Sequence, residues 1–183
     1  MWLAAVVAVV GAMLLPAGQA LAEERVCRGT IRAVTVDNLR VPLGATCTLE
    51  GTEVEGTVKV ERGATLRAFD IRVIGNVQAE NARLVVVREG SRIGGSVQIV
   101  HGGAAQILGN RINGDILFDD QDRALRANRN VVGGNLQAFQ NTGGVEIRNN
   151  RIDGNLQCKA NNPAPVGGGN IVQGNKEDQC RRL

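Results

Sequence analysis

The sequence predicts an all-β fold: a single-stranded right-handed parallel β-helix, or solenoid, of about seven turns of 19–20 residues each. Two observations support this prediction. A pattern of apolar residue, any residue, glycine, small polar residue and apolar residue recurs along the chain, with its glycines at positions 56, 75, 95, 114, 134, 154 and 174. Around each glycine, apolar and polar residues alternate, which is typical of a β-strand with one buried face.

Columns of similar residues indicate that the turns stack on one another. Two positions before the glycines, the apolar residues are Val54, Val73, Ile93, Ile112, Val132 and Ile152. Two positions after the glycines, they are Val58, Val77, Val97, Ile116, Leu136 and Leu156. Each repeat is too short for a strand–helix pair with two linkers, and no apolar stripe with the helical period of 3.6 residues occurs. The strict six-residue apolar period of left-handed hexapeptide coils is also missing, which favours the right-handed form.

A polar column occupies the position four residues before the glycines. Its members are Asn110, Asn130, Asn150 and Asn170. Asn tolerates the left-handed backbone conformation that sharp corners need, and stacked Asn side chains can hydrogen-bond along a ladder. We therefore expect this column to form a structural corner of the coil.

The first 22 residues contain no charged side chain. An apolar run over residues 2–15 is broken at 16–18 and followed by Ala20-Leu21-Ala22, an A-x-A cleavage site, which predicts a secretory signal peptide over residues 1–22. The apolar run is short for a membrane span; an uncleaved N-terminal membrane anchor is the alternative. We expect a secreted or periplasmic protein at the cell exterior, with no stable membrane span after signal cleavage.

The four cysteines suggest two disulfides, because exported chains with an even cysteine count commonly form them. Cys27 and Cys47, like Cys158 and Cys180, lie about one repeat apart. Strands stacked about 4.8 Å apart bring such pairs near the Cα separation of about 5.5 Å that a disulfide needs. We therefore expect the disulfides Cys27–Cys47 and Cys158–Cys180. A zinc site is disfavoured, because no C-x-x-C spacing occurs and the sequence has a single histidine.

The repeats are less regular at both ends of the mature chain. We expect an N-terminal cap over residues 23–50, β-helix repeats over 51–160 and a C-terminal cap over 161–183, because a solenoid needs atypical end units. In the last segment, Lys176 replaces the apolar residue expected two positions after Gly174, so the core should end there.

Several of these features resemble a known group of proteins. Gly-Asn-Val-Gln at 75–78, Gly-Asn-Leu-Gln at 134–137 and 154–157, and the terminal cysteines make the mature chain similar to small exported bacterial repeat proteins of the right-handed parallel β-helix class. That group has no established activity, so the resemblance implies the fold and no catalytic residues. The larger β-helix class includes polysaccharide-active enzymes, but likeness of fold is weak evidence for chemistry.

The composition argues against nucleic-acid binding. The formal net charge is only +3, and aromatic residues make up 2% of the chain. The basic excess is too mild to indicate a nucleic-acid partner, and stacking platforms for bases or sugar rings are scarce.

Two outward columns suggest a ligand-binding face. Three positions before the glycines, the arginines are Arg72, Arg92, Arg111 and Arg151, and three positions after the glycines, the glutamines are Gln78, Gln98, Gln137 and Gln157. Arginine suits bidentate contacts with carboxylate, sulfate or phosphate groups. The hypothesis is that this Arg/Gln face binds an acidic polysaccharide or another cell-surface component. The alternative is a solvated face without a ligand.

A second candidate site lies six positions after the repeat glycines of two successive turns, Gly95 and Gly114. His101 and Asp120 should be neighbours there on adjacent turns, with Asp119 beside them. A His–Asp pair can act as a general base, and acidic residues on the flank of a β-helix could bind Ca²⁺. Because charged residues are common in loops, we assign no metal and no cofactor. No G-x-S-x-G, P-loop or H-E-x-x-H motif occurs.

The sequence thus favours an exported, non-catalytic structural or binding module. The alternative is a polysaccharide-cleaving enzyme, a lyase or hydrolase, that uses His101, Asp119 and Asp120. A monomer or weak self-association is expected, with end-to-end association of the terminal strands as a third role.

Overall fold

The chain forms a β-solenoid of three parallel sheets. The computed structural model describes residues 23–88 and 90–183, so the predicted signal peptide lies outside the described residues. Within these ranges, all of the helices and strands assigned are β-strands.

The strands form three sheets, A, B and C. Sheet A contains β1 (Glu24–Val26), β4 (Asn38–Val41), β7 (Val58–Val60), β10 (Val77–Glu80), β13 (Val97–Val100), β16 (Ile116–Asp119), β19 (Leu136–Phe139), β22 (Leu156–Lys159) and β25 (Lys176–Asp178). Sheet B contains β2 (Thr30–Arg32), β5 (Thr46–Glu50), β8 (Thr65–Phe69), β11 (Leu84–Arg88), β14 (Ala104–Leu108), β17 (Leu125–Asn128), β20 (Val145–Arg148) and β23 (Val166–Gly168). Sheet C contains β3 (Thr35–Val36), β6 (Glu53–Val54), β9 (Arg72–Val73), β12 (Arg92–Ile93), β15 (Arg111–Ile112), β18 (Val131–Val132), β21 (Arg151–Ile152) and β24 (Ile171–Val172).

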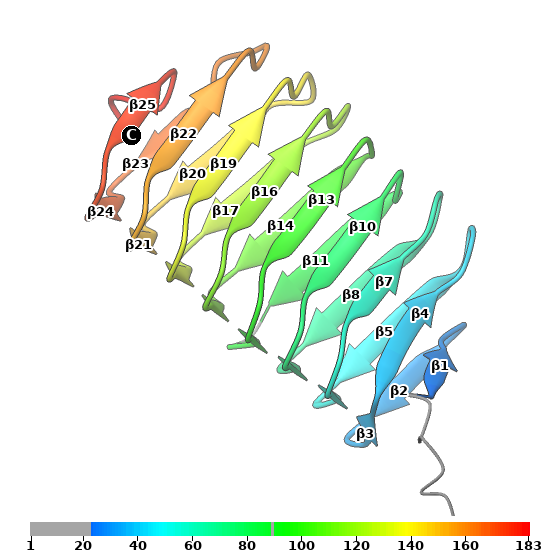
Figure 1. Ribbon diagram of the computed structural model, residues 1–183. Helices are drawn as coiled ribbons and strands as arrows, with labels where there is room; N and C mark the ends of the chain where they lie inside the picture. Colours follow the sequence, from blue (N-terminus) through cyan, green and yellow to red (C-terminus); the bar gives the residue numbers. More distant parts are fainter. Residues whose placement is uncertain (1–22, 89) are drawn as a thin grey trace, which may run out of the picture.

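Each turn of the coil contributes one strand to each sheet, in the order A, B, C. In Figure 1 the nearer strands run toward the upper right, the farther strands return, and successive turns are added toward the upper left, so the coil is right-handed. Sheets B and C each contain eight strands, and eight stacked strands are separated by seven steps, which confirms the predicted fold and about seven turns.

The core is made of the predicted apolar columns. Val54, Val73 and Ile93 are in register on neighbouring strands of sheet C, and Val58, Val77 and Val97 are in register on sheet A. All six side chains are buried. Burial of one such side chain stabilises a fold by roughly 1.5–3 kcal/mol, and the repeat adds several of them with every turn.

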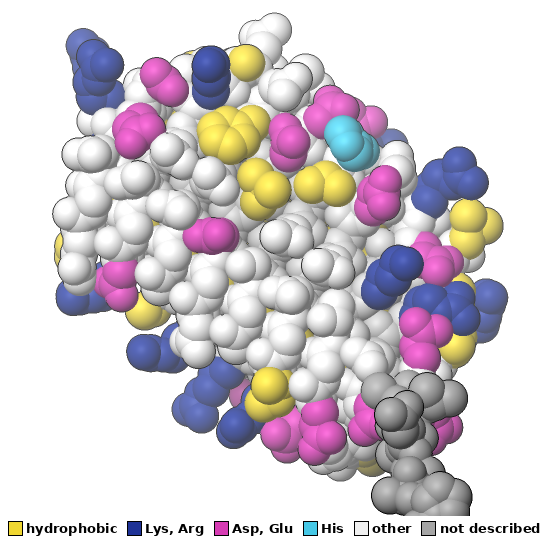
Figure 2. Space-filling model, viewed as in Figure 1, with side chains coloured by type: hydrophobic (Ala, Val, Ile, Leu, Met, Phe, Trp, Pro, Cys, Tyr) yellow, Lys and Arg dark blue, Asp and Glu magenta, His cyan; other side chains and the backbone are white. Residues whose placement is uncertain are grey.

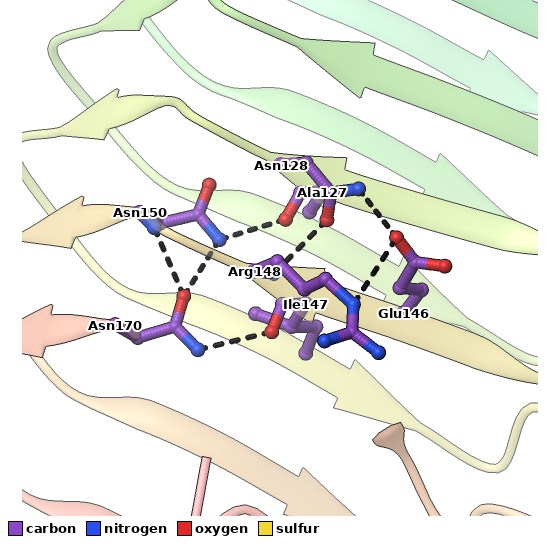
Figure 3. Close-up of polar contacts among 7 residues, drawn as sticks. All are labelled: Ala127, Asn128, Glu146, Ile147, Arg148, Asn150 and Asn170. Carbon is purple, nitrogen blue, oxygen red and sulfur yellow. Dashed lines mark hydrogen bonds and ion pairs between the residues drawn. The ribbon is translucent and has the colours of Figure 1, made fainter. Parts of the chain in front are cut away.

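The asparagine ladder (Asn110, Asn130, Asn150 and Asn170) forms as predicted and is buried. Figure 3 shows that Asn150 donates its Nδ2 hydrogens to the carbonyl oxygen of Ala127 at 2.7 Å and to Oδ1 of Asn170 at 2.9 Å. Each Asn therefore satisfies a buried carbonyl and also links its turn to the next one. The predicted left-handed conformation, however, lies one residue earlier, at positions such as Arg129 (φ 57°) and Asn149 (φ 56°).

A second ladder, which the sequence analysis did not identify, lies at the corner after sheet A. The amide ladder consists of Gln121, Asn141, Asn161 and Gln179. Asn141 and Asn161 donate Nδ2 hydrogens to the carbonyl oxygens of Phe118 and Ala138, and Asn141 also bonds Oδ1 of Asn161 at 2.8 Å. The left-handed residues of this corner lie just before the ladder, as Asp120 (φ 53°) and Gln140 (φ 55°) do, and His101 (φ 52°) has the same conformation one turn before Asp120.

The close stacking of successive turns explains both the repeated glycine and the small polar residue that follows it. The side chain of each small polar residue accepts a hydrogen bond from the backbone N–H one turn later, as Asn135 Oδ1 does from Asn155 N at 2.8 Å. A Cβ atom at Gly154 would lie 2.6 Å from that same Oδ1 atom and 2.7 Å from the carbonyl oxygen of Gly134. Only glycine lets successive turns approach this closely.

Disulfides join the two outermost turns at each end. Cys27 pairs with Cys47 at a Cα separation of 5.5 Å, and Cys158 pairs with Cys180 at 5.2 Å, as predicted. Disulfides form and persist in oxidising compartments, so both bonds indicate that the protein is found in such an environment. The predicted division into caps and central repeats stays a prediction.

Candidate functional site

The arginine column lies along the outer face of sheet C. Strands β9, β12 and β15 place Arg72, Arg92 and Arg111 in register on three consecutive turns. Val131 occupies the next position on β18, and Arg151 follows on β21. The buried residue after each of these arginines fixes the strand, so that the arginine side chain points outward.

The arginines of this column differ in their ion pairs. Arg72 bonds Glu53 on the preceding turn, with 3.2 Å between Nε and Oε1. Within residues 23–88 and 90–183, Arg92, Arg111 and Arg151 form no ion pair. Like charges on neighbouring strands repel, and among the described residues no ion pair offsets the charges of Arg92 and Arg111.

Some arginines elsewhere on the solenoid are paired with carboxylates on adjacent turns. Arg40 bonds Glu24 at 2.6 Å and Glu61 at 3.4 Å, and Arg32 bonds Glu50 at 2.7 Å.

Exposed arginines such as Arg67 and Arg126 on sheet B also form no ion pair among the described residues, but neither has an arginine beside it on a neighbouring strand. What distinguishes sheet C is the register that places Arg72, Arg92 and Arg111 side by side.

A shallow hollow of about 360 Å³ lies between the arginine side chains of sheet C. It is lined by Arg72, Val73, Ile74, Arg92, Ile93, Gly94, Arg111 and Asn113. Ile74 is 49% exposed and gives the hollow an apolar part. Figure 2 shows basic side chains along the lower-left border of the view, where the strands of sheet C lie in Figure 1.

The glutamine column lies on a different sheet. Gln78 and Gln98 are in register on β10 and β13 of sheet A, Leu117 follows, and Gln137 and Gln157 are in register on β19 and β22. The side chains bond one another, at 3.3 Å from Gln78 Nε2 to Gln98 Oε1 and 2.8 Å from Gln137 Nε2 to Gln157 Oε1. The structure therefore does not bring the predicted Arg/Gln set together in one face, because the glycine corner separates sheet C from sheet A.

Another hollow, of about 610 Å³, lies over sheet A. Gln78, Gln98 and Leu117 line it together with Lys59, Glu61, Arg62 and Glu80, and no arginine of the sheet C column does. The sequence analysis did not single out Lys59, Glu61 or Glu80 as site residues. Lys59 is in register with Gln78, and Glu61 and Glu80 both lie five positions after a repeat glycine, so this spacing could have revealed them.

His101 and Asp120 are neighbours at the corner after sheet A, as the spacing predicts. His101 Nδ1 lies 3.1 Å from Asp120 Oδ2, and the side chains are 54% and 64% exposed. The hydrogen bond to Asp120 raises the pKa of His101, the negative charges of Asp120, Asp119 and Glu80 add to the increase, and desolvation opposes it. Figure 2 shows the histidine beside acidic side chains.

The three candidate catalytic residues do not converge on one cleft. A hollow of about 250 Å³ is lined by His101 together with residues such as Arg83, Asp122 and Arg123, but by neither Asp119 nor Asp120. Asp119 lies on β16, in register with Val100 and Phe139. Among the described residues, no group of three or more His, Cys, Asp or Glu side chains could hold a metal ion.

The comparisons with known proteins gave no match. No protein-family model matches the chain, and neither a curated protein nor a solved structure matches it. In the part of the chain that the structure describes, no helix is long and apolar enough to cross a membrane.

Proposed function

We propose that this protein is an exported, non-catalytic binding module that holds an acidic polysaccharide along the arginine column of sheet C. The observation that supports this proposal most directly is the register of Arg72, Arg92 and Arg111 on three consecutive strands, where Arg92 and Arg111 form no ion pair among the described residues.

The geometry of the column suits a linear polyanion. Parallel strands repeat about every 4.8 Å, so Arg72, Arg92 and Arg111 present three guanidinium groups in a row along the solenoid axis. Carboxylate or sulfate groups along a polysaccharide would relieve the repulsion between these groups, and guanidinium forks bind such anions in a bidentate manner. Because the side chains are exposed, salt should weaken the contact.

The rigid scaffold supports a binding role rather than catalysis. The arginines project from two-residue strands whose neighbouring residues are buried in the core, so the spacing of the charges is fixed before a ligand arrives, which reduces the entropic cost of binding. The two disulfides fit a location at the cell exterior, where acidic polysaccharides are found.

The test is binding of the purified protein to polygalacturonate, alginate and a sulfated glycan, with neutral dextran as the uncharged control. In the double variant Arg92→Glu/Arg111→Glu, we expect affinity for the acidic chains to fall about tenfold or more. The matched control is Arg67→Glu/Arg126→Glu, which makes the same charge change at exposed positions of sheet B. Equal losses in both double variants would show a general charge effect and contradict a site on sheet C.

A second candidate function, a polysaccharide-cleaving enzyme, is favoured by the hydrogen bond between His101 and Asp120. Against it, the raised pKa of His101 makes the imidazole less available as a base. The same assay distinguishes the two functions if polymer length is followed. Shortened chains that disappear with His101→Ala or Asp120→Asn would replace the binding proposal with the enzymatic one.

A further inference from the structure

One inward-facing column of sheet A, the column of Val58 and Val77, changes from apolar to cationic at both ends of the solenoid. Arg25 on β1 is in register with Leu39, and Lys176 on β25 is in register with Leu156. The positions between them hold Leu39, Val58, Val77, Val97, Ile116, Leu136 and Leu156, all of them buried. Residues in register on parallel strands face the same side of the sheet, so both cations occupy inward-facing positions.

The two ends would otherwise fit one another. Strands β1 and β25 are the outermost strands of sheet A, and all paired strands of the solenoid are parallel. The edge of β25 in one copy can therefore pair with the edge of β1 in a second copy and continue the sheet. Such a head-to-tail contact does not close and would produce fibres.

Exposed apolar side chains gather near these same ends. Val26 and Val34 in the first turn are 43% and 49% exposed, and Val166 and Ile171 in the last turn are 56% and 62% exposed. A second copy of this chain is the partner that such ends fit, because it alone offers three parallel edges with the same cross-section.

We propose that Arg25 and Lys176 prevent this end-to-end stacking. In a stacked pair the two cations would become neighbours, about 4.8 Å apart, in a column that is otherwise dry. Asp178, in register with Cys158, could compensate only one of them. Burying a charge without a partner is strongly unfavourable, and inward-pointing charges are a known protection of sheet edges.

The C-terminal end has a further cover. The chain turns back after β25, with a hydrogen bond of 3.1 Å from Leu183 N to the carbonyl oxygen of Cys180. Cys180 and Leu183 are buried there. Among the described residues no comparable turn covers β1, so at the N-terminal end the protection rests on Arg25.

The experiment restores the apolar residue that the column requires at each end. The double variant Arg25→Val/Lys176→Leu and the unchanged protein are compared by sedimentation velocity and electron microscopy over a range of concentrations. We expect the unchanged protein to remain small and the weight-average mass of the double variant to rise about twofold or more with concentration, with end-to-end particles. Arg126→Val adds the same apolar surface on sheet B and should not associate.

A charge reversal tests the electrostatic cause separately. Arg25→Glu would place a carboxylate opposite Lys176 of the next copy, so we expect association at low salt that high salt reverses. The proposal is overturned if both Arg25 variants stay as small as the unchanged protein, if Arg126→Val associates equally, or if the unchanged protein itself forms end-to-end particles.

Discussion

The two halves of the solenoid build the corner before sheet C in different ways. In the N-terminal half the buried corner positions hold Thr52, Ile71 and Ser91, whereas the C-terminal half has the asparagine ladder. Thr52 Oγ1 bonds the carbonyl oxygen of Ile31 at 3.0 Å, and Ser91 Oγ bonds that of Arg88 at 2.7 Å. Ser91 Oγ also accepts a hydrogen bond from the backbone N–H of Ile71 at 3.2 Å. Ile71 itself has no polar side chain, so these three residues form no continuous ladder of side-chain hydrogen bonds.

The asparagine ladder links its turns continuously. The side chain of Asn150 donates to Ala127 and Asn170 and accepts from the backbone N–H and the Nδ2 group of Asn130. Buried backbone groups must find partners, and the asparagine side chains supply them at every turn of the C-terminal half. Among the described residues of the N-terminal half, only the threonine and serine hydroxyl groups do so at this corner, which shows that the corner tolerates different residues and that asparagine adds a continuous connection between turns.

The largest loss of stability is therefore expected when a central asparagine of the ladder is replaced. Asn150→Ala removes the partners of the Ala127 carbonyl and the Asn130 N–H, and we expect it to lower the free energy of unfolding by about 3 kcal/mol. Ser91→Ala in the N-terminal half removes a smaller set of bonds and should cost about 1 kcal/mol.

Urea unfolding of both variants measures this difference, with the exposed Asn113→Ala as a control that should unfold like the unchanged protein. Equal losses for Asn150→Ala and Ser91→Ala would mean that the ladder does not stabilise the C-terminal half beyond the hydroxyl contacts.

The repeat explains why so much of this architecture could be predicted from the sequence. A fixed spacing sets the register directly, so the core columns, the asparagine ladder and both disulfides follow from counting residues. The amide ladder was missed because its column begins only at Gln121, after Ala82 and Gly102. The left-handed position was misplaced by one residue although the sequence carried a signal for it. The column just before the corner residues holds Gly51, Asp70, Gly90, Gly109, Asn149 and Gly169. Only Arg129 in this column departs from residues that favour this conformation.

The candidate site was less predictable, because spacing does not reveal how sharply the chain bends. Residue counts place Arg92 and Gln98 in regular columns, but they contain no information on the glycine corner that puts the two columns on different sheets. The ion pairs of an arginine likewise depend on side-chain reach, as at Arg72 and Glu53.

A smaller loss of stability is expected when a glycine is replaced at the corner between sheets C and A, which both halves share. A Cβ atom at Gly75 would lie 2.6 Å from the carbonyl oxygen of Gly56, and one at Gly154 would lie 2.7 Å from that of Gly134. We expect Gly75→Ala and Gly154→Ala to lower the free energy of unfolding by similar amounts, about 2 kcal/mol each, because the backbone must shift to relieve the contact.

Gly29→Ala is the matched control, since a Cβ atom there meets no atom within 4 Å. The same urea unfolding measurements apply to all three variants. A loss confined to Gly154→Ala would show that the halves differ at this corner as well, whereas equal losses would restrict their difference to the corner before sheet C.

The last prediction concerns the turns where the two halves meet, and the quantity it measures is a pKa. The hydrogen bond to Asp120 is the main cause of the raised pKa of His101, so Asp120→Asn should lower this pKa toward the ordinary value of about 6.5. Because the folded-state pKa is raised, the stabilisation from the pair is fully present below about pH 6.5 and is lost as the pH rises through the folded-state pKa. NMR titration of the single histidine measures the shift, with Asp122→Asn, in the same hollow as His101, as the control. If Glu80→Gln lowers the pKa of His101 and Asp120→Asn does not, the acidic surroundings rather than the hydrogen bond between the two turns hold the proton.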